Sequence, residues 1–236
     1  MFNIIKKSDH LKHFKIIIVA LSLIIYTLCV VDNSICEVPK NGLVAEFLFE
    51  DNVNDTSGNE KLAEINGNIT YSSGIIGQAA VFDGNSWLTL HDFYLPTNTG
   101  TVSVWVYVDE TAENCACIID TETHNRSTFI ANSKNEDCNA LANTFRIGYH
   151  LTNHSITKSN WVLLTFTYNN SVGKGFFNGE YVGEYNAPFN SYERPSYAGG
   201  FDGSIIGGCV GTTEPNNSLF NGMLDDLRAS FISSKN

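Results

Sequence analysis

Oxygen-bearing side chains gather at two places in the sequence that could bind a cation, the segment 51–60 and a pair of aspartates near the C-terminus. The candidates are Asp51, Asn52, Asn54, Asp55, Ser57, Asn59, Asp225 and Asp226. Calcium takes about six to eight hard oxygen ligands from carboxylates, amides, backbone carbonyls and water. Without a cation, Asp55 and Ser57 would still form a turn held by side-chain hydrogen bonds, and the residues alone favour that simpler interpretation.

Aromatic side chains could instead stack on sugar rings. The candidates are Trp87, Trp105, Trp161, Tyr149, Tyr181, Tyr185, Tyr192 and Tyr197. Trp161 opens an apolar segment and is predicted to lie in the core. Trp105 lies on the polar side of an alternating segment, where packing between sheets is favoured over a binding face. The segment 190–202 is typical of a recognition loop or of a variable connection. No ligand-binding residue is assigned from the sequence.

Several enzyme classes are excluded by missing patterns. The chain has neither the Gly-x-Ser-x-Gly elbow nor a glycine-rich phosphate loop. His150 and His154 have i, i+4 spacing, but their segment predicts a strand running into a turn and lacks the accompanying Glu of a zinc helix. We interpret the chain as a non-enzyme.

The N-terminal segment differs in composition from the rest of the chain. Four lysines precede an apolar run over residues 16–31 that suits a secretory signal core better than a membrane span. We predict a signal peptide over residues 1–36 and a single domain over residues 37–236, so the protein would be secreted or extracellular. The alternative is an uncleaved anchor that holds the domain at the cell surface.

The formal net charge of −11 restricts the partners. An acidic domain repels nucleic acid and anionic membrane surfaces. It is compatible with neutral ligands or with cations held by carboxylates. Alternatively, the charge only maintains solubility.

Four cysteines follow the predicted cleavage site, namely Cys115, Cys117, Cys138 and Cys209. An even number in an exported chain predicts two disulfides. Cys115 and Cys117 would share one face of a strand, so each is expected to bond to Cys138 or Cys209, in one of two pairings. A zinc site is the alternative, although the spacing is unusual for one. Predicted glycosylation sites, for a eukaryotic secretory pathway, are Asn54, Asn68, Asn125, Asn153, Asn169 and Asn216.

Short apolar runs separated by turn residues predict an all-β fold. Residues 101–109 alternate, with four valines on one face. Asn178-Gly179 between two strand-like runs predicts a tight hairpin. The other predicted strands cover residues 43–50, 79–82, 87–90, 117–120, 128–131, 144–152, 161–168, 204–206 and 222–230. Many short strands at regular spacing indicate a two-sheet antiparallel sandwich or jelly roll.

The order of five segments resembles the LamG-like jelly-roll family, part of the concanavalin A-like lectin/glucanase superfamily. They are GLVAEFLFEDNVNDTSGN, GQAAVFDG, TVSVWVYVDE, NWVLLTFTYNN with the following GKGFFNGEYVGE, and FNGMLDDLRAS. The resemblance implies a concanavalin A-like sandwich with one structural Ca²⁺ between the early loop and the final strand. By position in the motifs, Asp55 and Asp225 are its favoured ligands, with Asp51, Ser57, Asn59 and Asp226 as further candidates.

The resemblance also implies the function, which is recognition of a carbohydrate or an extracellular protein. A divergent glycoside hydrolase is the first alternative. Related glucanases carry a Glu-x-Asp-x-x-Glu triplet on one strand, and a retaining enzyme needs two carboxylates about 5 Å apart. This chain has no such triplet, and neither Glu46 with Glu50 nor Asp225 with Asp226 forms a plausible pair. A ligand-free adhesive or structural surface domain is the second alternative.

Overall fold

The computed structural model describes residues 40–91, 93, 99–112, 116–121, 129–131, 144–147, 150–169, 172–186, 203–208 and 219–231. The predicted signal segment 1–36 lies outside these residues, so its cleavage and the domain boundary stay predictions. Cys115, Cys138, Cys209, Asn125 and Asn216 also lie outside them, as does the segment 190–202.

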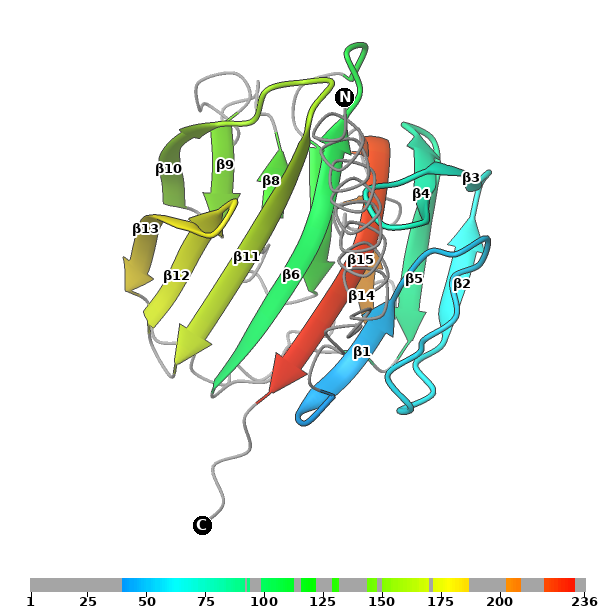
Figure 1. The fold of residues 1–236 in the computed structure, drawn as a ribbon, viewed down its shortest axis with the longest axis horizontal. Coiled ribbons are helices and arrows are strands. Elements are labelled where there is room, and N and C mark those ends of the chain that lie inside the picture. Colours follow the sequence, from blue (N-terminus) through cyan, green and yellow to red (C-terminus); the bar gives the residue numbers. More distant parts are fainter. Residues whose placement is uncertain are drawn as a thin grey trace, which may run out of the picture. The chain divides into compact units, whose positions relative to one another are not determined.

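The described part of the chain is a sandwich of two antiparallel sheets, which confirms the predicted jelly-roll class (Figure 1). Sheet A has the order β13-β12-β11-β6-β15-β4-β3, with β1 also paired to β15, and sheet B has the order β10-β9-β8-β7-β14-β5-β2. The strands are β1 Leu43–Phe47, β2 Ala63–Asn66, β3 Thr70–Ser73, β4 Gln78–Asp83, β5 Trp87–His91, β6 Thr99–Val108, β7 Ala116–Thr121, β8 Phe129–Ala131, β9 Thr144–Ile147, β10 His150–Ser155, β11 Trp161–Asn169, β12 Val172–Phe177, β13 Glu180–Asn186, β14 Gly203–Ile206 and β15 Asn221–Phe231.

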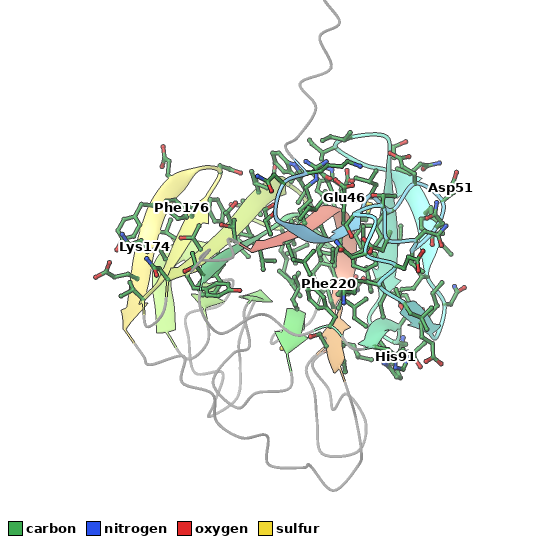
Figure 2. The ribbon with its side chains drawn as sticks, turned by 90° about the horizontal axis from the view of Figure 1, so that it is seen from below. Glu46, Asp51, His91, Lys174, Phe176 and Phe220 are labelled. Carbon is green, nitrogen blue, oxygen red and sulfur yellow. The ribbon has the colours of Figure 1, made fainter. Side chains whose placement is uncertain are left out.

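The core lies between the sheets and is built by strict alternation. Every second residue of β6 and β11 is buried, including the four valines of β6 that the sequence assigned to one face. Phe82 from β4 and Phe220 meet edge to face inside it, with ring centroids 5.9 Å apart. Figure 2 shows Phe220 in the middle of the sandwich. The residues opposite these core positions therefore face away from the core.

The Asn178-Gly179 hairpin joins β12 and β13, as predicted. Both turn residues have positive φ, 51° and 83°, the conformation that a two-residue hairpin requires. The Asn178 side chain also accepts the Leu163 backbone N–H at 2.9 Å, which ties the hairpin to β11.

Two strand predictions were wrong in detail, and two strands were not predicted. The strand predicted over residues 43–50 ends at Phe47, because Phe49 and Asp51 have positive φ values of 59° and 55°. The segment 144–152 is split into β9 and β10, which pair with each other. β2 and β3 were not predicted. Both are short edge strands with mostly exposed side chains, so neither has an apolar alternation to detect.

Within the described ranges, no helix is long and apolar enough to cross a membrane.

Candidate functional site

The outer face of sheet A, the side turned away from the core, carries a cluster of aromatic side chains. Trp105 and Tyr107 on β6 and Trp161 on β11 are partly exposed, and the residues between them are buried. Strand register places Trp161 opposite Tyr107 and Leu163 opposite Trp105. The rings of Tyr107 and Trp161 lie 5.6 Å apart between centroids. We call Trp105, Tyr107 and Trp161 the aromatic cluster.

This placement corrects two expectations. Trp161 is not a core residue, because Val162 and Leu164 of β11 point inward and Trp161 lies on the opposite face. Trp105 does not pack between the sheets, because the valines on either side of it do. The alternation of β6 put Trp105 on the polar face correctly. The error was to expect that face to be covered by the second sheet.

A second aromatic pair continues the outer face toward the sheet edge. Phe176 on β12 lies opposite Thr165 of β11, and its ring meets that of Tyr181 on β13 edge to face, with centroids 6.0 Å apart. Tyr181 is 54% exposed. Figure 2 shows Phe176 and Lys174 at this end of the sandwich, away from Phe220 in the core.

A polar pocket of about 500 Å³ lies on β6, β11 and β12, at the far end of β6 from the aromatic cluster. Its wall offers threonine hydroxyls, one amide and one ammonium group. The lining residues are Thr99, Gly100, Thr101, Thr167, Tyr168, Asn169, Val172 and Lys174. The outer face thus offers ring surfaces at one end and hydrogen-bonding groups at the other, about 20 Å apart along β6 at the usual rise per strand residue.

Asp55, the favoured calcium ligand, is already surrounded by hydrogen-bond donors. Its two oxygens accept the backbone N–H groups of Glu46, Ser57 and Lys61, each at 2.9 Å, and the Ser57 hydroxyl at 2.8 Å. Burial acts to raise the pKa of Asp55, but these N–H donors and the hydroxyl together lower it below its ordinary value. Asp55 is a carboxylate that holds a turn.

The same loop covers the free edge of β1. Ser57 Oγ donates to the carbonyl of Val44 at 3.2 Å, and Asn59 Nδ2 donates to that of Leu43 at 2.9 Å. The N–H of Thr56 donates to the Glu46 carbonyl at 2.8 Å. These bonds occupy backbone groups that an edge strand would otherwise leave open. The bonds between Asp55 and Ser57 are those that the cation-free interpretation expected, whereas the bonds of Ser57 and Asn59 to β1 were not predicted.

Asp225 lies elsewhere, beneath the turn that joins β3 and β4. Its Oδ2 accepts the N–H groups of Ile75 and Ile76, at 2.8 and 2.9 Å, while Oδ1 is buried without a hydrogen-bond partner. Burial raises the pKa of Asp225, with smaller contributions from the Asp226 and Glu50 carboxylates, against the two N–H bonds that lower it. Asp51 also lies near this turn, since its Oδ1 accepts a hydrogen bond from Nε2 of Gln78, the first residue of β4, at 3.1 Å.

Asp226 belongs to a third group, around a buried glutamate. The β15 strand bulges between Asp225 and Arg228, and Asp226 has a φ of 50°. Arg228 lies 2.9 Å from Asp226 Oδ1 and 3.0 Å from Oε1 of Glu46, which is only 3% exposed. Burial raises the pKa of Asp226, and the Arg228 charge opposes that shift. The sequence did not reveal the roles of Glu46 and Glu50. Glu46 pairs with Arg228 of β15, and Glu50 accepts the N–H of Gln78 beside the turn between β3 and β4. Neither partner is close to its glutamate in the sequence.

The six predicted calcium ligands are therefore divided among three sets of described contacts. Among the described residues, no group of three or more His, Cys, Asp or Glu side chains is arranged to hold a metal ion. As a single ligand set the six do not fit one ion. Asp225 and Asp226 each have a buried Oδ1 without a hydrogen-bond partner, but that of Asp226 lies 2.9 Å from the Arg228 guanidinium, whereas no ion pair is described for that of Asp225.

Cysteine and sequon predictions are only partly within the described ranges. Cys117 is buried and disulfide-bonded, and the other three cysteines of the predicted pairings lie outside those ranges. Asn54, Asn68 and Asn169 are exposed. For Asn153 only the strand position, in β10, is described.

The sequence profile of the concanavalin A-like lectin/glucanases superfamily matches residues 82–230, more than half of the chain. The chain belongs to this superfamily. A search of curated proteins by sequence finds no match.

Solved structures with the same fold include domain 4 of AbnA, an extracellular GH43 arabinanase from Geobacillus stearothermophilus, in complex with arabinotriose. It is 22% identical, with a TM-score of 0.58, over 80% of this chain and 91% of that one. The binding domain of botulinum neurotoxin serotype D/C is 13% identical, with a TM-score of 0.54, over 81% of this chain and 49% of that one. The binding domain of Paraclostridial Mosquitocidal Protein 1 is 14% identical, with a TM-score of 0.56, over 83% of this chain and 50% of that one. This chain therefore spans about half of the two toxin binding domains. At these identities the likeness establishes the fold.

Proposed function

We propose that this chain is an exported recognition module that binds a glycan along the outer face of sheet A. The aromatic cluster carries the proposal, because three partly exposed rings on neighbouring strands offer flat apolar surface for sugar rings. The hydroxyl and amide groups of the pocket supply hydrogen bonds on the same face. The arabinotriose complex of AbnA domain 4 and a botulinum neurotoxin DC binding domain in complex with SialylT support a glycan as ligand in general terms.

Binding to an array of neutral oligosaccharides tests the proposal. We expect Trp105→Ala and Trp161→Ala each to weaken the affinity for a bound glycan by about tenfold, which corresponds to about 1.4 kcal/mol per ring. Trp87→Ala, on β5 of sheet B, removes a partly exposed tryptophan from the other sheet and is the matched control. Melting temperatures would confirm that all three variants fold. Equal losses in all three, or no glycan binding by the wild type, would reject the site.

We propose binding without hydrolysis, since the sequence lacks the glucanase carboxylate triplet. Incubation of the protein with the glycans that it binds should then release no reducing ends. Release that follows the affinity ranking would instead support the glycoside hydrolase alternative.

We also propose export through cleavage of the signal segment. The lysine-flanked apolar run at the N-terminus and the disulfide at Cys117 support an oxidising destination. N-terminal sequencing of the protein recovered outside the cell is expected to begin after Cys36. Recovery of residues 1–36 on surface protein would favour the anchored alternative.

Calcium remains a proposal, now in a narrower form. The unpartnered Oδ1 of Asp225, whose carboxylate is repelled by the Asp226 and Glu50 charges, is a position where a cation would relieve repulsion. Asp55 is not needed in that set, because donors already surround both of its oxygens. The chemistry of a bound calcium would be structural, holding the turn between β3 and β4 to the final strand.

A further inference from the structure

The turn between β3 and β4 is held from below by a buried carboxylate. Gly74 N–H donates to the Gly77 carbonyl at 2.9 Å and closes the turn. The next two N–H groups, of Ile75 and Ile76, both donate to Asp225, which comes from β15 and is 1% exposed. Each of the four residues of the turn thus has a backbone group fixed by a hydrogen bond.

Two further carboxylates, those of Glu50 and Asp51, bind Gln78 directly after the turn. The N–H of Gln78 donates to Glu50 Oε2 at 3.1 Å, and the Gln78 side chain donates to Asp51 at 3.1 Å. Glycine is required at both ends of the turn. A Cβ on Gly74 would collide with Asp225 Oδ2, and one on Gly77, which has a φ of +66°, would collide with the Glu50 carboxylate. The turn therefore has little freedom to rearrange.

This fixed turn presents two large apolar side chains to solvent. Ile75 is 44% exposed and Ile76 is 56% exposed. Exposed apolar side chains that lie side by side can mark an interaction site, and a preorganised turn reduces the entropy lost when a partner binds. Of the five large hydrophobic side chains exposed in the described ranges, Leu62 and Ile65 also lie by β2, at the same end of the sandwich as β3 (Figure 1).

The charges around the turn restrict what can cover it. Glu50 and Asp51 are exposed beside the two isoleucines, and the whole chain has a net charge of −11. A second copy related by a two-fold axis would bring these like charges together. An anionic membrane surface would repel them. A partner with positive charge around an apolar pocket would be attracted.

We propose that the Ile75–Ile76 turn is a docking element for a protein partner whose surface has an apolar pocket with a basic rim. The two isoleucines enter the pocket, and Glu50 and Asp51 face its rim. Figure 2 places Asp51 at the opposite end of the molecule from Lys174 and Phe176. Strand register places Asp225, which holds the turn, opposite Trp105 of the aromatic cluster, so the turn borders the proposed glycan face. The two isoleucines and the aromatic cluster are then neighbouring binding surfaces, which separate substitutions distinguish.

Synthetic peptides in which Leu and Phe are flanked by Lys and Arg serve as the probe, with matched peptides that carry Glu instead. We expect the basic peptides to bind, with affinity lowered at least about tenfold by the double substitution Ile75→Ser and Ile76→Ser. Leu62→Ser, at a side chain 65% exposed, is the matched control and should leave affinity unchanged. Asp51→Asn keeps an acceptor for Gln78 but removes a charge, so it should weaken binding mainly at low salt.

Three results would overturn the proposal. One is equal binding, or no binding, of basic and acidic peptides by the wild type. Another is retention of the wild type, but not of the double serine variant, on phosphatidylcholine vesicles, which would identify a lipid surface instead. A concentration-dependent dimer in sedimentation that the serine variant abolishes would identify a second copy. Glycan binding by the double serine variant should be unchanged, so the two proposed surfaces are tested separately.

Discussion

Replacing Asp55 with alanine is expected to lower the free energy of unfolding by about 3 kcal/mol. The substitution leaves the N–H groups of Glu46, Ser57 and Lys61 without their acceptor, and hydrogen bonds to a charged group contribute about 1.5–3 kcal/mol each before partial replacement by water. For a domain of this size the loss corresponds to a fall of roughly 6–12 °C in melting temperature. Urea unfolding followed by tryptophan fluorescence measures it directly.

Asp83→Ala is the matched control for this experiment. Asp83 is exposed, and its carboxylate accepts one backbone N–H, that of Asn85 at 2.9 Å, within a local turn. Its removal should cost about 0.5 kcal/mol or less. A loss for Asp55→Ala no larger than that of the control would mean that the loop against β1 is held by its other bonds.

The stability difference between the wild type and Asp55→Ala should depend on pH in a definite direction. Because the pKa of Asp55 is lowered on folding, its contribution is complete above the ordinary value of 3.8 and is lost as the pH falls through the folded value. The stability difference between the wild type and Asp55→Ala should therefore shrink below about pH 4. If addition of EDTA at pH 7 reproduced the effect of the substitution, Asp55 would be a calcium ligand after all.

The faces of the long strands could be predicted from the sequence because strand side chains alternate with a period of two. The β6 segment has valine at one parity and Thr, Ser, Trp and Tyr at the other, so its core face was unambiguous. β11 is different, since Trp161 and Leu163 are apolar and nevertheless face outward, opposite Tyr107 and Trp105. With apolar residues on both faces, alternation could not separate core from surface, and Trp161 was assigned to the core.

The partners of the acidic residues could not be predicted because they depend on which strands become neighbours. Asp55 and Asp225 were paired as residues from the two ends of one domain, and both ends do meet, through β1 and β15. However, Asp55 holds the free edge of β1, while Asp225 lies under the turn between β3 and β4. β3 itself was not predicted, so its turn could not be considered as the partner of Asp225.

The second large effect is expected at Asp225. Asp225→Ala should destabilise the fold by about 3 kcal/mol, because two part-buried N–H groups lose a charged acceptor. Asp225→Asn separates hydrogen bonding from charge. Its amide oxygen can accept both N–H groups, so in EDTA at pH 7 its stability should lie within about 1 kcal/mol of the wild type. Thermal melts of both variants, with and without added calcium, make the comparison.

Calcium and protons would compete for Asp225, and each would compensate its buried charge. The raised pKa means that its contribution to stability is complete below the ordinary value of 3.8 and is lost as the pH rises through the folded value. In EDTA, the free energy of unfolding of the wild type should therefore increase relative to that of Asp225→Asn as the pH is lowered from 7. Calcium at about 100 times its dissociation constant would stabilise the wild type by about 2.7 kcal/mol at pH 7 and would leave Asp225→Asn unchanged.

These two measurements separate the explanations for the unpartnered Oδ1 atom. If calcium raises the melting temperature of the wild type only, the cation compensates the buried charge at neutral pH. If calcium changes neither protein but the acid-dependent gain remains, a proton on Asp225 is the compensation, and the domain needs no metal. Asp225 also fixes the N–H groups of Ile75 and Ile76, and these bonds are stronger to a carboxylate than to a protonated acid. A cation that keeps Asp225 ionised would therefore hold the turn that we propose as a docking element, whereas a proton would weaken its hold. If calcium raises the melting temperature at pH 7, it should also increase the peptide affinity.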